Sequence, residues 1–336
     1  MVKLPGLIDP HVHLRDPGQT YKEDFLTGTT AAIFGGYTTV CDMPNNKIPV
    51  TTAGRLNEKI KTAKKKIVCD TGFYFGTLGD NFDQFSPVYA KVHGLKLYLN
   101  QTTGNYLIGE KELENIYRYW QSNKPILIHA EDSMLEKVFS VVKKTGKKTH
   151  ICHVSSKNEL RQIINAKKNN LPVTCGVTPH HLFLTEKDNQ LMKPTLKTVK
   201  DQAFLWQNIK LVDVVESDHA PHTIEEKTSA DPPFGVPGLE TTLPLLLTRL
   251  PVDEIIRLCF TGPRAIFNIP FDPDTHIVVD EKYSYTIENR QLKTKCRFTP
   301  FAGRKVKGKV QKVVIRGKTV MENDKLLVQP GFGKII

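Results

Sequence analysis

The chain has 336 residues, of which 39% are hydrophobic, so it is long enough for one large domain with a smaller attached unit. No apolar run approaches the roughly 20 residues of a membrane-spanning helix, and the N-terminal residues lack the apolar segment of a secretion signal, so no membrane association is expected. The six cysteines are scattered without Cys-x-x-Cys spacing, which predicts free thiols in a reducing, cytoplasmic environment.

The formal net charge is +12, which raises the question of a nucleic-acid partner. The lysines are dispersed, however, apart from short runs at 59–66 and 143–148 in segments predicted to be helical, where a solvated face is the ordinary explanation. No zinc-finger or RNA-binding motif accompanies them. The charge therefore excludes no enzyme class, predicts no nucleic-acid partner, and gives weak support for an anionic small-molecule substrate.

Apolar segments of strand type alternate with helical segments along most of the chain, which indicates parallel βα units. Strands are predicted at residues 7–15, 37–43, 67–75, 94–99, 125–130, 149–154, 172–177 and 210–217. Helices are predicted at residues 23–34, 52–65, 86–92 (weakly), 110–121, 134–145, 157–168, 201–208, 241–250 and 253–267. This α/β pattern matches a (β/α)₈ TIM barrel, for which about 250 residues are typical. A doubly wound open sheet is the alternative, which is disfavoured because polar residues recur at nearly every strand's carboxyl end.

From about residue 275 the pattern changes to short alternating runs separated by turns, such as 309–315 and 319–321. These runs predict antiparallel strands in a small C-terminal β appendage. We therefore expect a barrel over residues 1–270 and a β subdomain over 271–336 that packs on it, since so short a unit has little core of its own.

The first predicted strand carries His11 and His13, and side chains two apart on a strand face the same way. An isolated His-x-His pair is more often a surface feature than a metal site. Later strands end in further candidate ligands, namely His129, His153 and Asp218. Because the carboxyl ends of parallel barrel strands share one rim, these side chains should converge there and could hold two divalent metal ions.

Lys96 lies within an otherwise apolar strand, Gly-Leu-Lys-Leu-Tyr-Leu. An ammonium group cannot bind a cation, but burial lowers the pKa of a lysine and makes the neutral amine available. A neutral amine can add carbon dioxide to form a carbamate, an anionic ligand with two oxygens that can bridge two metals. We therefore take carboxylation of Lys96 as a hypothesis.

Several motifs together are highly specific: GLIDPHVHLR at 6–15, MPN at 43–45, GLKLYL at 94–99, IHAE at 128–131, HICH at 150–153, PHHL at 179–182, SDHAPH at 217–222 and PGLE at 237–240. In these motifs the sequence resembles the dihydroorotases of the amidohydrolase superfamily. The likeness is greatest to the dihydroorotase domain of the multifunctional pyrimidine-synthesis polypeptide, and it covers essentially the whole chain.

The resemblance implies the reversible, zinc-dependent cyclisation of N-carbamoyl-L-aspartate to L-dihydroorotate in de novo pyrimidine biosynthesis. It implies two Zn²⁺ ions, one held by His11, His13, Asp218 and carboxylated Lys96, the other by His129, His153 and the same carbamate. Asp218 would act as general base and then general acid.

The same likeness implies that Arg15, Asn45 and His222 hold the substrate's carboxylate and that the backbone at Gly238 contacts the ring amide. It places a lid at 101–107, with Thr102 and Thr103 reaching the substrate. His180 and His181 would orient other groups without binding metal.

Three positions depart from the family pattern, one of which is Thr103 in the lid, where some relatives carry a phenylalanine. Gly176 stands where relatives of the multifunctional type carry a glutamate linked to an extra zinc, so Cys152 lacks a carboxylate partner and we expect no third metal. Lys193 stands where relatives carry an arginine that clamps the substrate carboxylate. Lysine keeps the charge and loses the bidentate geometry, so weaker substrate binding is expected.

Two other readings stay open. A related cyclic amidase (dihydropyrimidinase, hydantoinase or allantoinase) would share the metal chemistry without needing a carboxylate clamp. A degenerate, non-catalytic dihydroorotase-like scaffold domain is the second, although none of the expected metal ligands is missing. The resemblance also implies a homodimer, and a place beside carbamoyl-phosphate synthetase and aspartate transcarbamoylase in one polypeptide.

Overall fold

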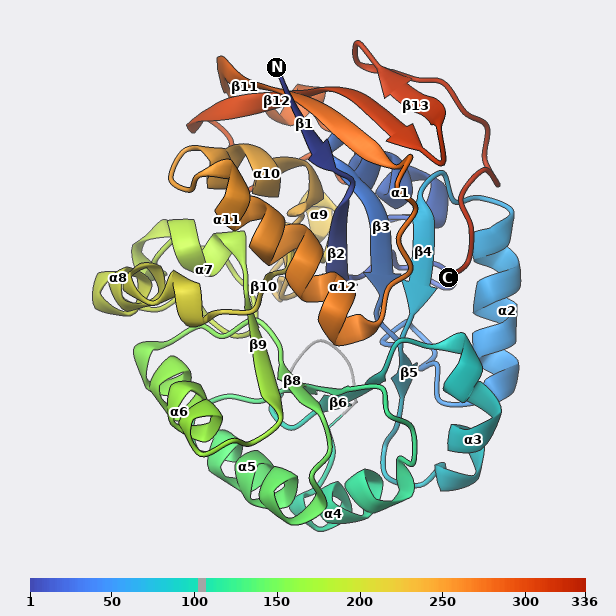
Figure 1. The fold of residues 1–336 in the computed structure, drawn as a ribbon, viewed down its shortest axis with the longest axis vertical. Coiled ribbons are helices and arrows are strands. Elements are labelled where there is room, and N and C mark those ends of the chain that lie inside the picture. Colours follow the sequence, from blue (N-terminus) through green and yellow to red (C-terminus); the bar gives the residue numbers. More distant parts are fainter. Residues whose placement is uncertain (102–106) are drawn as a thin grey trace.

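The computed structural model describes residues 1–101 and 107–336. Thr102 and Thr103, which the sequence analysis places in a lid, lie outside the described residues. Within the described part, parallel strands alternate with helices around a closed barrel, and a separate antiparallel sheet covers one side of it (Figure 1).

The barrel strands are β2 Leu7–Val12, β3 Tyr37–Asp42, β4 Asp70–Phe73, β5 Phe75–Gly76, β6 Leu95–Tyr98, β7 Ile126–His129, β8 Thr149–Ile151, β9 Val173–Val177 and β10 Val214–Val215. Strands β2 to β4 form one parallel sheet, and β5 to β10 form another. β4 and β5 occupy a single position in the barrel, interrupted at Tyr74. The circle closes where Val12 bridges His219 and the His13 N–H donates to the His219 carbonyl (2.8 Å). The predicted (β/α)₈ barrel is therefore confirmed, and the open-sheet alternative is wrong.

The helices on the outside of the barrel are α1 Phe25–Phe34, α2 Ala53–Lys64, α3 Phe85–Val88, α4 Glu110–Tyr119, α5 Met134–Thr145, α6 Lys157–Lys168, α7 Pro179–Phe183, α8 Val199–Gln207, α9 Ile224–Lys227, α10 Leu239–Leu247, α11 Val252–Ile256 and α12 Gly262–Phe267. Side-chain caps fix several starts: Ser156 and Glu159 form a reciprocal capping box at α6. The helix predicted at 253–267 is divided, because a π-helical turn (Arg257–Thr261) separates α11 from α12.

The inner strands are buried on both faces, as the near-continuous apolar runs predict for a parallel sheet. The prediction of a strand at 210–217 began too early, because Ile209–Leu211 form a 3₁₀ turn before the short β10. Among the described residues, no helix is long and apolar enough to cross a membrane.

The appendage is a five-stranded sheet in the order β1-β11-β12-β13-β14, with bounds Val2–Pro5, His276–Thr286, Lys305–Ile315, Lys318–Glu322 and Lys325–Leu326. β1 precedes the first barrel strand in sequence and pairs antiparallel with β11, so the extreme N-terminus joins this sheet. Buried residues of β11 and β12 belong to the same apolar core as the barrel residues. The C-terminus returns to the barrel, where Ile335 bridges Thr71 of β4 (Figure 1).

Asp9 ties β2 to β10 inside the barrel and makes folding stability depend on pH. Its buried carboxylate accepts hydrogen bonds from the backbone N–H groups of His11 (3.1 Å) and Ser217 (3.3 Å). Burial nevertheless raises the pKa of Asp9 to about 7. The native state thus keeps a proton that the unfolded chain releases near pH 4, and the free energy of unfolding should fall as pH rises from about 4 to about 7.

Asp9→Asn should flatten this part of the stability curve. Chemical denaturation at about pH 5 and about pH 8 measures the change, with the exposed Asp83→Asn as a control that keeps the wild-type slope. An Asp9→Asn variant whose stability still fell by the wild-type amount would contradict the assignment.

Candidate active site

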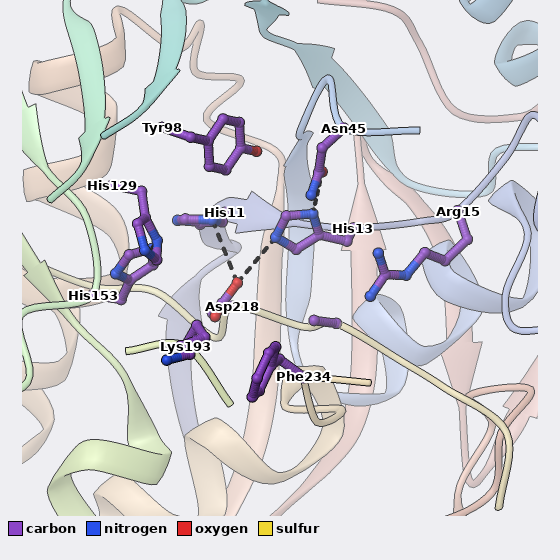
Figure 2. A pocket seen from close by; sticks show the side chains of 12 residues that line it. His11, His13, Arg15, Asn45, Tyr98, His129, His153, Lys193, Asp218 and Phe234 are labelled. Carbon is purple, nitrogen blue, oxygen red and sulfur yellow. Dashed lines mark hydrogen bonds and ion pairs between the residues drawn. The ribbon is translucent and has the colours of Figure 1, made fainter. Parts of the chain in front are cut away.

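The carboxyl ends of β2 and β10 bring together His11, His13 and Asp218. One Asp218 oxygen lies 3.4 Å from His11 Nε2 and 3.1 Å from His13 Nε2, and the two rings have centroids 5.3 Å apart (Figure 2). All three residues are buried. The strand alternation thus predicted correctly that both histidines face the same side, and their donor atoms could hold a metal ion together with Asp218.

Two further histidines face this group from the other side of the rim. His129 ends β7 and His153 follows β8; His129 Nδ1 lies 3.1 Å from His153 Nε2. The His153 ring lies 5.2 Å from that of His11, so the four imidazoles line one pocket with Asp218 (Figure 2). The convergence expected from the strand ends is therefore present.

Burial holds most of these imidazoles in the neutral form that binds metals. It lowers the pKa of His13 to about 4, and it lowers the pKa values of His129 and His153 as well. Burial acts in the opposite direction on Asp218 and would raise its pKa. The adjacent His11 and His13 outweigh burial and hold the pKa of Asp218 below its usual range, so this carboxyl is ionised at neutral pH.

Lys96, on β6, is fully buried and is not among the residues that line the pocket. Its Nζ donates to Cys152 Sγ (3.2 Å) and lies 5.0 Å from the centre of the Tyr98 ring. Burial raises the pKa of the Cys152 thiol to about 12, so the sulfur accepts this hydrogen bond as a thiol. Among the described residues no carboxylate pairs with Lys96, which is unusual for a buried lysine.

Three residues of the site have left-handed backbone conformations: Arg15 (φ 62°), His153 (φ 39°) and Asp218 (φ 45°). Such conformations cost on the order of 1–3 kcal/mol for a residue with a side chain and persist only where the surroundings impose them. Each lies two or three residues beyond the end of a barrel strand, and all three side chains are buried at this rim.

Asn45 contacts a histidine and does not simply form a turn after Pro44. Its Oδ1 accepts a hydrogen bond from His13 Nδ1 at 2.6 Å (Figure 2). This bond fixes the proton on Nδ1 and leaves Nε2, which faces Asp218, with its lone pair. Asn45 also lines the pocket, so it can both orient His13 and face a substrate.

A cationic group occupies the other end of the pocket. Arg15 is buried, its Nε donates to the Pro221 carbonyl (3.2 Å), and its guanidinium lies 3.1 Å from His222 Nε2. Burial, with Arg15 and Lys22 nearby, lowers the pKa of His222, so that ring is neutral. Lys193 lies 5.1 Å from the Phe234 ring centre and lines the same pocket. The pocket thus joins an end lined by histidines and Asp218, here called the candidate metal-binding end, to an end lined by cationic side chains.

Gly238 is held by a chain of buried groups that the sequence analysis missed. Its N–H donates to His219 Nδ1 (3.2 Å), and His219 Nε2 lies 3.4 Å from Glu23. The hydroxyl of Thr294, from the C-terminal segment, donates to the same Glu23 carboxylate. A Cβ at position 238 would lie 2.8 Å from the Ser217 carbonyl, so only glycine allows this approach. In the described structure Gly235, and not Gly238, lines the pocket.

His180 and His181 lie beside the candidate metal-binding end. His181 Nδ1 lies 2.7 Å from the Thr178 hydroxyl, and Nε2 donates to the Pro194 carbonyl at 3.1 Å. Both nitrogens of His181 are occupied, which agrees with the expected orienting role. His180 is buried next to it, with ring centroids 4.6 Å apart.

Glu216 is the most prominent residue that the sequence analysis missed. It is fully buried, and its carboxylate lies 3.2 Å from His11 Nδ1. The donor atoms of His11, Cys152 and Glu216 lie within 4.8 Å of one another. The expectation that Cys152 has no carboxylate near it because of Gly176 is therefore wrong, since Glu216 provides one from the neighbouring strand. A glutamate two residues before Asp218, directly after the apolar pair Val214 and Val215, was the available signal.

Comparison with known proteins agrees with this geometry. Residues 2–175 match the amidohydrolase family. The chain is 41% identical to the multifunctional protein CAD of Squalus acanthias over 99% of its own length, but it spans only 16% of that protein. It is 38% identical to a dihydroorotase of Pyrococcus horikoshii, over 99% of this chain and 84% of the archaeal one.

Solved structures give the same fold. An L-hydantoinase from Arthrobacter aurescens has a TM-score of 0.93 at 22% identity, over 98% of this chain and 87% of the other. An inactive dihydroorotase-like domain of a Chaetomium thermophilum CAD-like protein has a TM-score of 0.85 at 25% identity, over 99% and 98%. The chain belongs to the amidohydrolase family, in the group of the dihydroorotases.

Proposed function

We propose that this chain is a metal-dependent dihydroorotase that interconverts N-carbamoyl-L-aspartate and L-dihydroorotate. One observation carries the proposal: four buried imidazoles and an ionised carboxylate meet at the strand ends, beside a buried arginine that suits a carboxylate. The buried arginine favours an acidic substrate over the uncharged substrates of related cyclic amidases.

The residues fit a metal centre. The buried nitrogens His11 Nε2, His129 Nε2 and His153 Nδ1 make no hydrogen bond within the described residues, a costly state unless another group satisfies them. We propose that His11, His13 and Asp218 hold one zinc ion and that His129 and His153 hold a second. Bound zinc would supply a hydroxide at neutral pH and polarise the amide carbonyl.

We further propose that Lys96 is carboxylated and is shared by both ions. An unpaired ammonium at a fully buried position is strongly unfavourable, and Lys96 has no carboxylate partner among the described residues. Conversion of the amine to a carbamate would replace that charge with the anion that two neighbouring cations require.

The protein's own groups perform the remaining steps. Arg15 and Lys193 bind the carboxylates of the substrate, with the guanidinium of Arg15 forming the paired contacts. Asp218, ionised because His11 and His13 lower its pKa, accepts the proton of the attacking water in hydrolysis and returns it to the leaving nitrogen. In cyclisation Asp218 takes a proton from the ureido nitrogen. Asn45 keeps His13 in one tautomer throughout.

Metal analysis and two substrates test the proposal together. The purified protein should contain two zinc ions per chain, cyclise carbamoyl-aspartate and lose this activity when a chelator removes the metal. It should act poorly on 5,6-dihydrouracil, which lacks the carboxylate. Zinc-free protein without activity would support a scaffold domain, and preference for dihydrouracil would support a different cyclic amidase.

Arg15→Lys tests the carboxylate clamp. The substitution keeps the positive charge and removes the second parallel hydrogen bond, so we expect KM to rise by roughly 10-fold, about 1.4 kcal/mol of binding, with a smaller change in kcat. Steady-state cyclisation kinetics measure both constants. An unchanged KM would mean that Arg15 does not touch the substrate.

The likeness to the multifunctional relatives supports two further proposals on assembly. The chain works as a homodimer, and it operates beside carbamoyl-phosphate synthetase and aspartate transcarbamoylase modules of one polypeptide. Light scattering of the purified chain tests the first of these, since a monomer at assay concentration would exclude it.

A further inference from the structure

Glu216 lies behind the candidate metal-binding end of the pocket and contacts three residues that lie in or just after two other strands, β2 and β8. Its carboxylate lies 3.2 Å from His11 Nδ1 and 3.6 Å from His150 Nε2, and it accepts a hydrogen bond from the backbone N–H of His153. The side chain is fully buried. A buried carboxylate is retained only where partners satisfy it, and two of these partners are proposed metal ligands.

The contact with His11 decides which nitrogen of that ring faces the metal. Oε2 of Glu216 lies at ion-pair distance from His11 Nδ1 without the alignment of a hydrogen bond. A carboxylate this close favours the tautomer with the proton on Nδ1, which leaves the Nε2 lone pair directed at the Asp218 side of the pocket. The same carboxyl group accepts the backbone N–H of His153, so it acts here as a hydrogen-bond acceptor.

The contact with His153 stabilises a strained backbone. His153 has φ 39°, a left-handed conformation that a histidine adopts only under constraint. Its N–H would be unpaired in the barrel interior without the Glu216 oxygen. The Glu216 carboxylate thus contacts the side chain of His11, a proposed ligand of one zinc ion, and the backbone of His153, a proposed ligand of the other.

The space for Glu216 comes from Gly176 on the adjacent strand. β9 and β10 are paired in parallel, with Val214 opposite Gly176. A Cβ at position 176 would lie 2.6 Å from Glu216 Cδ and 2.6 Å from Oε1, closer than atoms can approach. Glycine at 176 is therefore a condition for the observed position of Glu216, and the two positions form one unit.

We propose that Glu216 is a positioning residue for the metal centre, seated by Gly176, which fixes the His11 tautomer and the His153 backbone so that both present their free nitrogens to the ions. The inference rests on the proposed metal-dependent function, and it adds residues outside the proposed ligand set. It predicts that substitutions at 176 and 216 act on metal binding through the same contact.

The test measures zinc content and the rate at which a chelator removes zinc, together with the thermal stability of the metal-free protein. Glu216→Gln and Glu216→Ala should weaken zinc binding by roughly 10–100-fold, with alanine the more severe. Gly176→Ala should weaken it similarly, because the added methyl displaces the carboxylate. In the double variant the Gly176→Ala change should weaken zinc binding little further, because the Glu216 carboxylate that it displaces is already absent.

Glu159→Gln is the matched control, because Glu159 is also a buried glutamate that accepts backbone hydrogen bonds, from Ser155 and Ser156. It should lower thermal stability and leave zinc binding unchanged. Unchanged zinc affinity in the Glu216 variants, or full additivity in the double variant, would overturn the inference while the wild-type enzyme still bound two zinc ions. A third zinc ion lost with Glu216 would overturn it too, since Glu216 would then be a ligand. A wild-type protein without zinc would instead overturn the proposed function.

Discussion

Asp218→Asn should lower the kcat of carbamoyl-aspartate cyclisation by roughly 10²–10⁴-fold, the range for loss of a general base. Asparagine has nearly the same shape, and its side-chain N–H can donate to the His13 Nε2 lone pair, so the fold should persist. It cannot take up the proton that Asp218 is placed to receive, and it no longer offers an anion to a metal ion. Initial rates at saturating substrate, normalised to the zinc content of each preparation, measure the effect.

Asp213→Asn provides the comparison for this variant. Asp213 precedes β10, and its carboxylate pairs with Lys167 at 2.5 Å, away from the residues that line the pocket. Its loss should reduce stability modestly and leave the rate per zinc ion intact. A fully zinc-loaded Asp218→Asn protein with wild-type kcat would show that the proton passes through another group.

The sequence was sufficient to predict the side chains that gather at the rim, because parallel strands in a barrel all end on the same face. His11 and His13 follow from the strand period, and His129 from the end of an apolar run. The sequence signal was weakest for short or interrupted elements. The predicted strand at 210–217 begins with a 3₁₀ turn, and nothing in the local pattern of 2–5 indicates that it pairs with β11.

The sequence could not predict which buried residues hold the active-site side chains in position. The contact of Glu216 with His11 spans 205 residues, and that of Glu23 with His219 spans 196. Such pairs depend on the way in which barrel closure places β2 beside β10, and no local period contains that information. The glycine at 176 was interpreted as the loss of a carboxylate. The structure shows that it makes room for a carboxylate from the neighbouring strand.

Lys96→Ala should abolish both zinc binding and cyclisation, with a loss in rate of about 10³-fold or more, because bound metal contributes several kcal/mol to such reactions. Two buried lysines allow a direct comparison. Lys59 pairs with Asp42 (2.8 Å) and donates to Asn46 (2.8 Å), whereas Lys96 contacts only a thiol and an aromatic ring among the described residues. Lys59 therefore has a carboxylate partner for its ammonium group, and Lys96 has none among the described residues.

Reconstitution of the metal-free protein distinguishes the role of Lys96 from that of Lys59. When zinc and bicarbonate are added together, the metal-free wild-type protein should regain its activity. Zinc added in carbon-dioxide-free buffer should restore much less activity, because the carbamate on Lys96 must form first. Lys59→Met should be less stable, since it leaves Asp42 unpaired, yet should keep the bicarbonate dependence. A small carboxylic acid should partly rescue Lys96→Ala and have no effect on Lys59→Met, since only the first variant has lost an anionic ligand. Full return of zinc and activity without bicarbonate would contradict carboxylation of Lys96. The burial of an unmodified amine would then rest on its contacts with Cys152 and Tyr98, and the metal centre would need another anion between its ions.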